Sequence, residues 1–161
     1  MDSEKLNKLK EATIESIKNN FKRDKQIFPV CIIVEPDGKT QFIGTPFRNL
    51  EEKKVMMGYV KDTCKKVKAI AVFIINEAWV RKTTPEQFKQ FNEEFKKTGK
   101  RISEYDDKKE VAMMIFETNT SSTLFMFDID RQKNELVNMV SSPTRGGDFM
   151  HTLCEIQTNN N

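Results

Sequence analysis

Histidine is nearly absent from the sequence, which limits the chemistry that the chain can carry out. Ser-His-Asp catalysis, Cys-His catalysis and most zinc sites use histidine, and this chain of 161 residues has one, His151. It precedes Cys154 by three residues, a spacing at which two side chains share one face of a helix. No third group that would orient the imidazole is evident, so we interpret His151 as a surface residue.

Cysteines are few, and the spacing of the three excludes the common frameworks built from them. Cys31, Cys64 and Cys154 are far apart and include no C-x-x-C pair, so neither a disulfide scaffold nor a zinc ribbon is predicted. Cys31 and Cys64 fall at positions that face the predicted core and are interpreted as small apolar residues. This usage is typical of a reducing compartment, and we expect a cytoplasmic protein.

The sequence also lacks the runs and loops that mark membrane and nucleotide-binding proteins. No apolar run approaches the roughly 18 residues of a membrane helix, and the N-terminus MDSEKLNKLK is too polar for a signal peptide. No Walker loop or G-x-G-x-x-G motif occurs, and Gly146-Gly147 after Arg145 is too short to indicate a phosphate or RNA site. We therefore expect no membrane association and no cofactor.

Apolar and charged residues are both plentiful, in proportions typical of one compact domain. Hydrophobic residues make up 37% of the chain, including 12 Phe and 8 Met, and charged residues make up 32%. Lysine and arginine outnumber acidic residues in residues 1–110, and the balance reverses in residues 111–161. The lysines alternate with acidic residues, which is typical of solvated helix faces, so a nucleic-acid partner has only weak support.

The first part of the sequence predicts a helix and a hairpin. Residues 3–22 place leucine, isoleucine and phenylalanine at helical spacing, with Ser3 as a candidate N-cap. Two β-branched runs, residues 27–35 and 40–45, flank Pro36-Asp37-Gly38, in which proline pre-sets φ and glycine supplies a left-handed position. We therefore expect an amphipathic helix followed by two antiparallel strands.

A second helix and a central strand follow the hairpin. Asn49 and Glu52 form a candidate capping pair for the helix. Its predicted apolar side consists of Val55, Met56, Tyr59, Val60, Cys64 and Val67. The run AIAVFII, residues 69–75, is apolar at every position, so we expect it to be covered on both faces at the centre of the sheet. A right-handed crossover through the helix would set this strand parallel to one strand of the hairpin.

The rest of the chain predicts a third helix, a loop and three strands. Thr84 and Gln87 form a capping box with proline at the first helical position, and the helix ends at Gly99. Its apolar side consists of Phe88, Phe91 and Phe95. A charged loop leads to two strands within residues 111–130 around a Thr/Asn/Ser turn, and then to a third in residues 134–140. These three strands form an antiparallel meander.

Together these elements predict one α+β domain over residues 1–142. Helices pack on a mostly antiparallel sheet, in the order α-β-β-α-β-α-β-β-β. The N-terminal helix is expected to dock on the sheet, because its apolar stripe would otherwise be exposed. Residues 143–161 are expected to be a loosely structured tail, with a short helix from Asp148 to Ile156 as its one candidate element.

Residues 28–80 contain a hairpin with a PDGK turn, a helix, and a strand that leads into NEAWV. This combination resembles a group of small uncharacterised proteins of bacteria and their phages. The resemblance implies neither an activity nor a site residue, because none is assigned in that group, and it ends at Val80.

Several carboxylates raise the question of a metal site. Asp37 and Lys39 form a D-x-K motif similar to that of restriction-type nucleases, and Asp128 and Asp130 lie on one face of a strand. However, Asp37 is explained by the tight hairpin turn, and Asp128 and Asp130 by a strand end beside a polar turn, where aspartate is common. We interpret all three as structural and predict no dependence on a divalent metal.

The residues beyond the predicted central strand include the only tryptophan of the chain. Glu77 and Trp79 fall where the apolar run ends, and ligands tend to bind beyond the carboxyl ends of buried strands. We expect Trp79 to close the core, and Glu77 to face solvent or to pair with Arg81. Glu77, Trp79 and Arg81 are the candidate binding residues, and Glu77 is the better candidate for a functional contact.

Two functions from different classes are compatible with these observations. The first is a non-catalytic protein-interaction domain, since histidine is scarce, no polar motif converges and both faces of the meander are apolar. Its partner would be another protein, or a second copy of the chain bound through the meander. The second is a small metal-dependent nuclease or hydrolase that uses Asp37, Lys39, Glu77, Asp128 or Asp130. We favour the first, and hence a protein that is not an enzyme.

Overall fold

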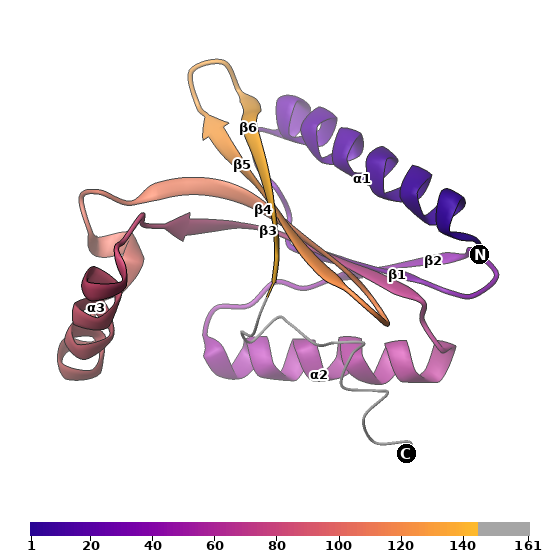
Figure 1. Cartoon of the computed structure of the whole chain (residues 1–161), viewed down its shortest axis with the longest axis horizontal. Helices are drawn as coiled ribbons and strands as arrows, with labels where there is room; N and C mark the ends of the chain where they lie inside the picture. Colours follow the sequence, from indigo (N-terminus) through magenta and orange to yellow (C-terminus); the bar gives the residue numbers. More distant parts are fainter. Residues whose placement is uncertain (145–161) are drawn as a thin grey trace.

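A six-stranded sheet organises the chain, and helices pack on both of its faces (Figure 1). The computed structural model describes residues 1–144. Neighbouring strands are all antiparallel, in the order β2-β1-β3-β4-β5-β6. In chain order the elements are α1 (Ser3–Asp24), β1 (Val30–Val34), β2 (Thr40–Gly44), α2 (Leu50–Val67), β3 (Ala71–Val80), α3 (Pro85–Thr98), the 3-10 helix η1 (Ile102–Glu104), β4 (Lys109–Thr118), β5 (Ser122–Asp130) and β6 (Glu135–Pro143). The predicted α+β class and element order are confirmed.

β3 and β4 form the centre of the sheet. Every residue from Ala71 to Ile75 is buried, as the uninterrupted apolar run predicted. β3 runs in the same direction as β2, because β1 lies between the two strands and is antiparallel to both. The connection through α2 is therefore a crossover over β1, and β3 is parallel to one strand of the hairpin as expected.

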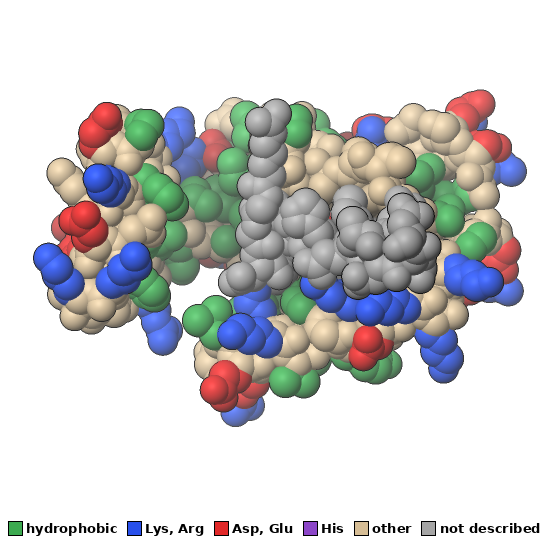
Figure 2. Space-filling view, turned by 60° about the horizontal axis from the view of Figure 1, so that its bottom comes forward, with side chains coloured by type: hydrophobic (Ala, Val, Ile, Leu, Met, Phe, Trp, Pro, Cys, Tyr) green, Lys and Arg blue, Asp and Glu red, His purple; other side chains and the backbone are tan. Residues whose placement is uncertain are grey.

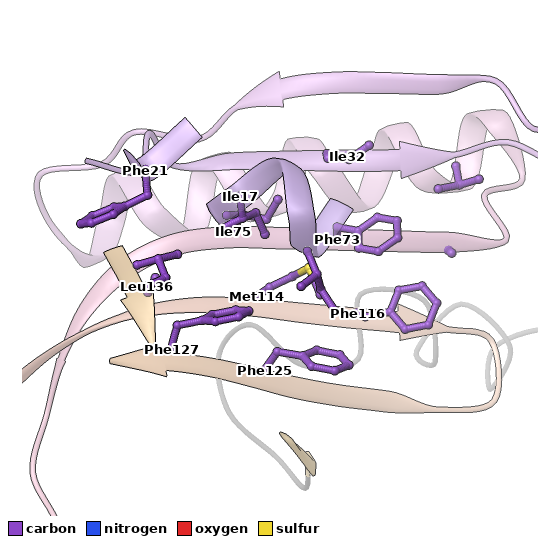
Figure 3. Packing of buried hydrophobic residues seen from close by; sticks show 14 residues of the cluster. Ile17, Phe21, Ile32, Phe73, Ile75, Met114, Phe116, Phe125, Phe127 and Leu136 are labelled. Carbon is purple, nitrogen blue, oxygen red and sulfur yellow. The ribbon is translucent and has the colours of Figure 1, made fainter. Parts of the chain in front are cut away.

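α1 covers one face of the sheet and closes the core on that face (Figure 3). Ile14, Ile17 and Phe21 lie on one side of the helix and pack against apolar side chains of all the strands except β2. The predicted docking of the N-terminal helix is thus confirmed. The N-cap is Asp2 and not Ser3 as predicted, because the Asp2 carboxylate accepts a backbone N–H of the first turn.

α2 packs on the opposite face of the sheet. Its buried side chains are Met57, Val60 and Cys64, which lie at helical spacing. The predicted apolar side was wrong in part, because Val55 and Tyr59 lie on the side of the helix away from the sheet and are exposed. Lysines are spread along the solvent side of α2 among acidic residues, as expected for a solvated helix (Figure 2).

Local hydrogen bonds delimit α2 and α3 where the sequence predicted. The side chain of Asn49 accepts the backbone N–H of Glu52 at the start of α2. At the start of α3, the side chains of Thr84 and Gln87 each accept the backbone N–H of the other residue, which is the predicted capping box. α3 ends at Gly99, whose φ of 70° is a left-handed conformation that glycine adopts without strain.

α3 lies beside the sheet and not on it (Figure 1). None of its side chains is buried, although its phenylalanines form an apolar stripe. The segment that follows holds the helix, since Phe91 contacts the ring of Tyr105 and the Tyr105 hydroxyl donates to the Glu94 carboxylate. Phe88 and Phe95 remain exposed. α3 therefore adds little to the core that α1 and α2 build.

β4, β5 and β6 form the predicted meander, with an irregularity in its outer strand. The pairing of β5 with β6 shifts register where Asn138 adopts a left-handed conformation, with φ of 51°. β6 extends through Pro143, and the backbone N–H of Thr144 donates to the carbonyl of Ser122. Strand pairing thus reaches the first two residues of the predicted tail.

The predicted C-terminal features lie outside the described residues. These are the helix of residues 148–156, the pair His151 and Cys154, and the stretch Arg145-Gly146-Gly147. Within residues 1–144, no helix combines the length and apolar character needed to cross a bilayer.

Candidate binding groove

β3 continues to Val80, beyond the strand end that the sequence predicted near Ile75. Glu77 and Trp79 therefore lie within the strand, where they pair with β4. Both point to the face that α1 covers, because side chains alternate along a strand and Ile75 belongs to the core on that face. We expected both residues beyond the end of the strand, but they lie within it. The reason is that β3 pairs with β1 only as far as Ile75 and with β4 as far as Val80.

Glu77 is engaged by the segment that follows α1, whereas we predicted solvent or Arg81. One carboxylate oxygen accepts the backbone N–H of Ile27 at 2.8 Å. The other oxygen lies 3.5 Å from the guanidinium of Arg131. The reason is geometric, because Glu77 faces α1 while Arg81 follows the end of the strand. Glu77 thus stabilises the junction between α1 and the sheet.

Arg131, in the turn between β5 and β6, joins separate parts of the chain at this junction. Its guanidinium donates to both carboxylate oxygens of Glu110 on β4 and to the backbone carbonyl of Lys25 after α1. It also lies over the ring of Phe21, 5.4 Å from the ring centroid. The hydrogen bonds with Glu110 raise the pKa of Arg131 above its usual value. These contacts fasten the C-terminal end of α1 to the sheet, so we assign them a structural role.

Trp79 is 43% exposed, so it does not close the core as predicted. Its end of β3 extends past α1 (Figure 1), and the ammonium group of Lys108 lies 5.2 Å from the ring. Arg81 forms hydrogen bonds of 2.6 and 2.9 Å with Asp107, and its guanidinium stacks 3.9 Å from the Tyr105 ring centroid. Arg81 therefore holds the segment after α3, Trp79 contacts Lys108, and Glu77 is engaged by the segment after α1.

The candidate metal ligands lie apart, and each has a structural partner. Asp37 accepts the backbone N–H of Lys39 at 3.0 Å in the β1–β2 turn and lies 2.7 Å from its ammonium group. Asp128 pairs with Lys109 at 2.6 Å, which lowers the pKa of Asp128, and Asp130 accepts two backbone N–H groups of the turn before β6. Within residues 1–144, no group of three or more His, Cys, Asp or Glu side chains is placed to hold a metal.

Cys31 and Cys64 lie in the interior between α2 and the sheet. Burial raises the pKa of Cys31 to about 11 and that of Cys64 to about 12, so both are protonated at neutral pH. We expect neither thiol to react with iodoacetamide in the folded protein under mildly alkaline conditions, and both to react after unfolding in urea. Peptide mass mapping of the two states measures this. Rapid alkylation of either residue in the folded chain would contradict their burial.

A groove of about 490 Å³ lies between α1 and the β1–β2 hairpin. It arises because α1 crosses the sheet diagonally (Figure 1). The amino group of Met1 donates to the carbonyl of Pro36 in the hairpin turn at 2.9 Å, and Lys22 near the other end pairs with Glu135 on β6 at 3.0 Å. Part of the sheet face over β1 and β2 is therefore left without a helix.

The groove has an apolar floor and an open aromatic side. Val30, Ile32 and Ile75 form part of the floor. Phe28 and Phe42 line the hairpin side and are 63% and 69% exposed. Large exposed rings beside an apolar floor are typical of a surface that binds an apolar partner. We therefore regard the groove as the candidate functional site.

This groove was not predicted from the sequence. A local signal existed, since Phe42 and Thr40 share one face of a short strand and Ala12 and Ser16 place short side chains on one side of α1. Whether such positions line a groove or lie under a helix depends on the path of α1 across the sheet. That path is set by contacts between distant residues, which the local pattern does not report.

Comparisons of the chain with protein-family models, with curated protein sequences and with solved structures found no match.

Proposed function

We propose that this protein is a non-catalytic interaction domain that binds the apolar face of a helix from another protein in the groove beside α1. The observation that carries the proposal is the groove itself, with its apolar floor and its exposed Phe28 and Phe42. The floor consists of strands that are already paired in the sheet, so it does not need to become ordered on binding. A preformed surface lowers the entropic cost of association.

The dimensions of the groove favour a helix as the bound element. α1 lines the groove from Leu9 to Asp24, which at a rise of about 1.5 Å per residue corresponds to roughly 22 Å, or about four helical turns. A second helix beside α1, at the usual interaxial distance of about 8–10 Å, would extend the helical layer over β1 and β2. Its apolar side chains would cover Phe28 and Phe42.

The ionisable side chains near the groove support binding more than catalysis. Arg23 and Asp24 are the titratable residues that line it, and they pair with each other at 2.7 Å. Glu77, behind the groove, is engaged by Ile27 and Arg131. A general acid or base needs a side chain that can reach a substrate, and among residues 1–144 this ion pair is the sole titratable part of the groove lining. The arrangement is that of an apolar docking surface with one polar end.

We further propose that the protein acts in the cytoplasm. The support is the state of the interior cysteines, since Cys31 and Cys64 are both free thiols in the structure. Proteins of oxidising compartments more often use their cysteines in disulfides.

Site-specific cross-linking in the native cell tests the proposed function. A photoreactive amino acid at Ser16, which is exposed and lines the groove, should form covalent products with a different protein. The same group at Asn19 is the matched control, because Asn19 is exposed on the same helix and is not part of the groove lining. We expect products at position 16 and few at position 19. Equal products at both positions, or none at position 16, would contradict the proposal.

Ala12→Glu supplies the second arm of this experiment. Ala12 is exposed and lines the groove, so the substitution should leave the fold intact while it places a charge against the apolar partner. We expect cross-linking from Ser16 to fall roughly ten-fold, equivalent to about 1.4 kcal/mol of binding free energy. Undiminished cross-linking in the Ala12→Glu variant would show that the groove does not hold the partner.

A further inference from the structure

We infer that the free edge of β2 pairs with β2 of a second copy of the chain, so that the sheet continues from one copy into the other across a two-fold axis. This inference goes beyond the proposed function, because it concerns the sheet edge and does not require a helix in the groove. It is carried by the backbone groups of β2, by the contrast between the two sheet edges, and by the side chains that the pairing brings together.

The register of the hairpin shows which backbone groups of β2 point away from β1. The backbone N–H of Thr45 donates to the carbonyl of Pro29, and beside the turn the backbone N–H of Glu35 donates to the carbonyl of Lys39. Lys39 and Thr45 are thus both bonded to the β1 side, and every second residue between them is bonded in the same way. In an antiparallel pair, residues bonded to the partner strand alternate with residues whose N–H and C=O groups point outward. Thr40, Phe42 and Gly44 therefore direct their backbone groups to the free edge.

Within the described part of the chain, nothing pairs with this edge. β2 is the outermost strand, and Thr40, Phe42 and Gly44 are all exposed. The strand keeps a continuous register with β1 and contains no charged residue and no proline. Charged side chains, proline and bulges are the usual devices that prevent an edge strand from pairing with another chain. β2 has none of them.

β6, at the opposite edge, carries two of these devices. Its register with β5 shifts near Asn138, which has φ of 51°, and the strand ends at Pro143. A bulge twists the edge locally and interrupts the ladder of outward groups. From the sequence we expected a second copy to bind through the meander. We now place this self-association at β2.

A two-fold axis at Phe42 pairs all the outward backbone groups of both copies. Phe42 then lies opposite Phe42 of the second copy, and Thr40 lies opposite Gly44 of the second copy. Each facing pair exchanges both of its N–H···O bonds, as in the hydrogen-bonded pairs of any antiparallel sheet. Glycine opposite threonine leaves room for the threonine side chain.

The same axis brings complementary side chains together. The exposed rings of Phe42 from the two copies lie side by side on one face of the joined sheet, at the open side of each groove.

A charge-swap experiment tests the dimer and its register together. The like-charge variant, Thr40→Lys with Gly44→Lys, places lysines opposite each other across the axis and should be monomeric. The opposite-charge variant, Thr40→Glu with Gly44→Lys, places glutamate opposite lysine at the same two positions and should remain dimeric. Both positions are exposed, and a Cβ at Gly44 would meet nothing closer than Pro46 at 3.9 Å, so both variants should fold.

Light scattering across a concentration series measures the mass, and circular dichroism checks the fold. We expect twice the chain mass for the wild type and for the opposite-charge variant, and the single chain mass for the like-charge variant. A wild type that is monomeric throughout, a dimeric like-charge variant, or a monomeric opposite-charge variant would each overturn the inference. Light scattering of the Ala12→Glu variant separates the two proposals, since Ala12 lines the groove and lies outside β2, so the dimer should persist while binding in the groove is lost.

Discussion

Replacing Phe21 with alanine is expected to lower the free energy of unfolding by about 3–5 kcal/mol. The ring is fully buried between α1 and the sheet, in the layer that Ile14 and Ile17 share. Truncation leaves a cavity that α1 cannot close without disturbing those neighbouring contacts, because interiors are closely packed. Urea unfolding at neutral pH, followed by circular dichroism, measures the loss.

Trp79→Ala is the matched control for this prediction. It removes a larger ring than Phe21→Ala does, but from a position that is 43% exposed. We expect a loss below about 1.5 kcal/mol, because much of the indole already contacts water in the folded state. Equal losses in the two variants would contradict the burial of Phe21 or the exposure of Trp79. The sequence alone suggested the opposite, with Trp79 closing the core.

Replacing Arg131 with alanine is expected to lower the free energy of unfolding by about 1.5–3 kcal/mol. The substitution removes the hydrogen bonds to Glu110 and to the carbonyl of Lys25, and it leaves Glu77 and Glu110 near each other without their shared cation. The partial exposure of the cluster keeps the loss below that of a fully buried ion pair, because solvent screens the charges. Urea unfolding measures this loss as well.

Lys133→Ala provides the control in the same turn. Lys133 is exposed, so its side chain should contribute no more than about 0.5 kcal/mol. A double-mutant cycle of Arg131→Ala with Glu110→Gln should show a coupling of about 0.5–3 kcal/mol, as for residues in direct contact. If Arg131→Ala were no more destabilising than Lys133→Ala, the structural role assigned to this cluster would be wrong.

Phe21→Ala and Arg131→Ala both remove contacts that hold α1 in place, and α1 forms one side of the groove. Phe21 and Arg131 lie at the C-terminal end of the helix, where the chain turns toward Ile27 and Phe28. Variants at these positions should therefore weaken binding in the groove as well as stability. Ala12→Glu differs from them, because it should affect binding while the unfolding transition stays nearly unchanged.

Much of the fold was predictable because its signals act over a few residues. The caps at Asn49 and Thr84 accept hydrogen bonds from backbone N–H groups three positions ahead, and in the hairpin turn Asp37 accepts one from the backbone N–H of Lys39. The central strand was recognisable because a strand with neighbours on both sides and cover on both faces needs no polar side chain. Where a helix presents apolar residues all around, as α2 does at Val55 and Tyr59, the pattern did not identify the buried side.

The surroundings of Glu77 and Trp79 were not predictable in this way, because these residues meet their neighbours only in the folded chain. Glu77 binds the backbone of Ile27 and approaches Arg131, whereas the sequence placed its partner nearby at Arg81. The exposure of Trp79 depends on how far β3 extends past α1, and no pattern within β3 reports this distance. Interactions between residues far apart in the sequence decided both outcomes.

The sequence by itself determined which helices and strands form and that they build an α+β fold, because caps, turns and periodicity are local properties. Only the tertiary structure decided that α1 runs diagonally from the hairpin turn to β6, held at its ends by Met1 and Lys22 and at its C-terminus by Arg131. That path leaves the floor of the groove and the edge of β2 uncovered. The physical reason is that a helix can dock on a sheet at several angles, and long-range contacts select one of them.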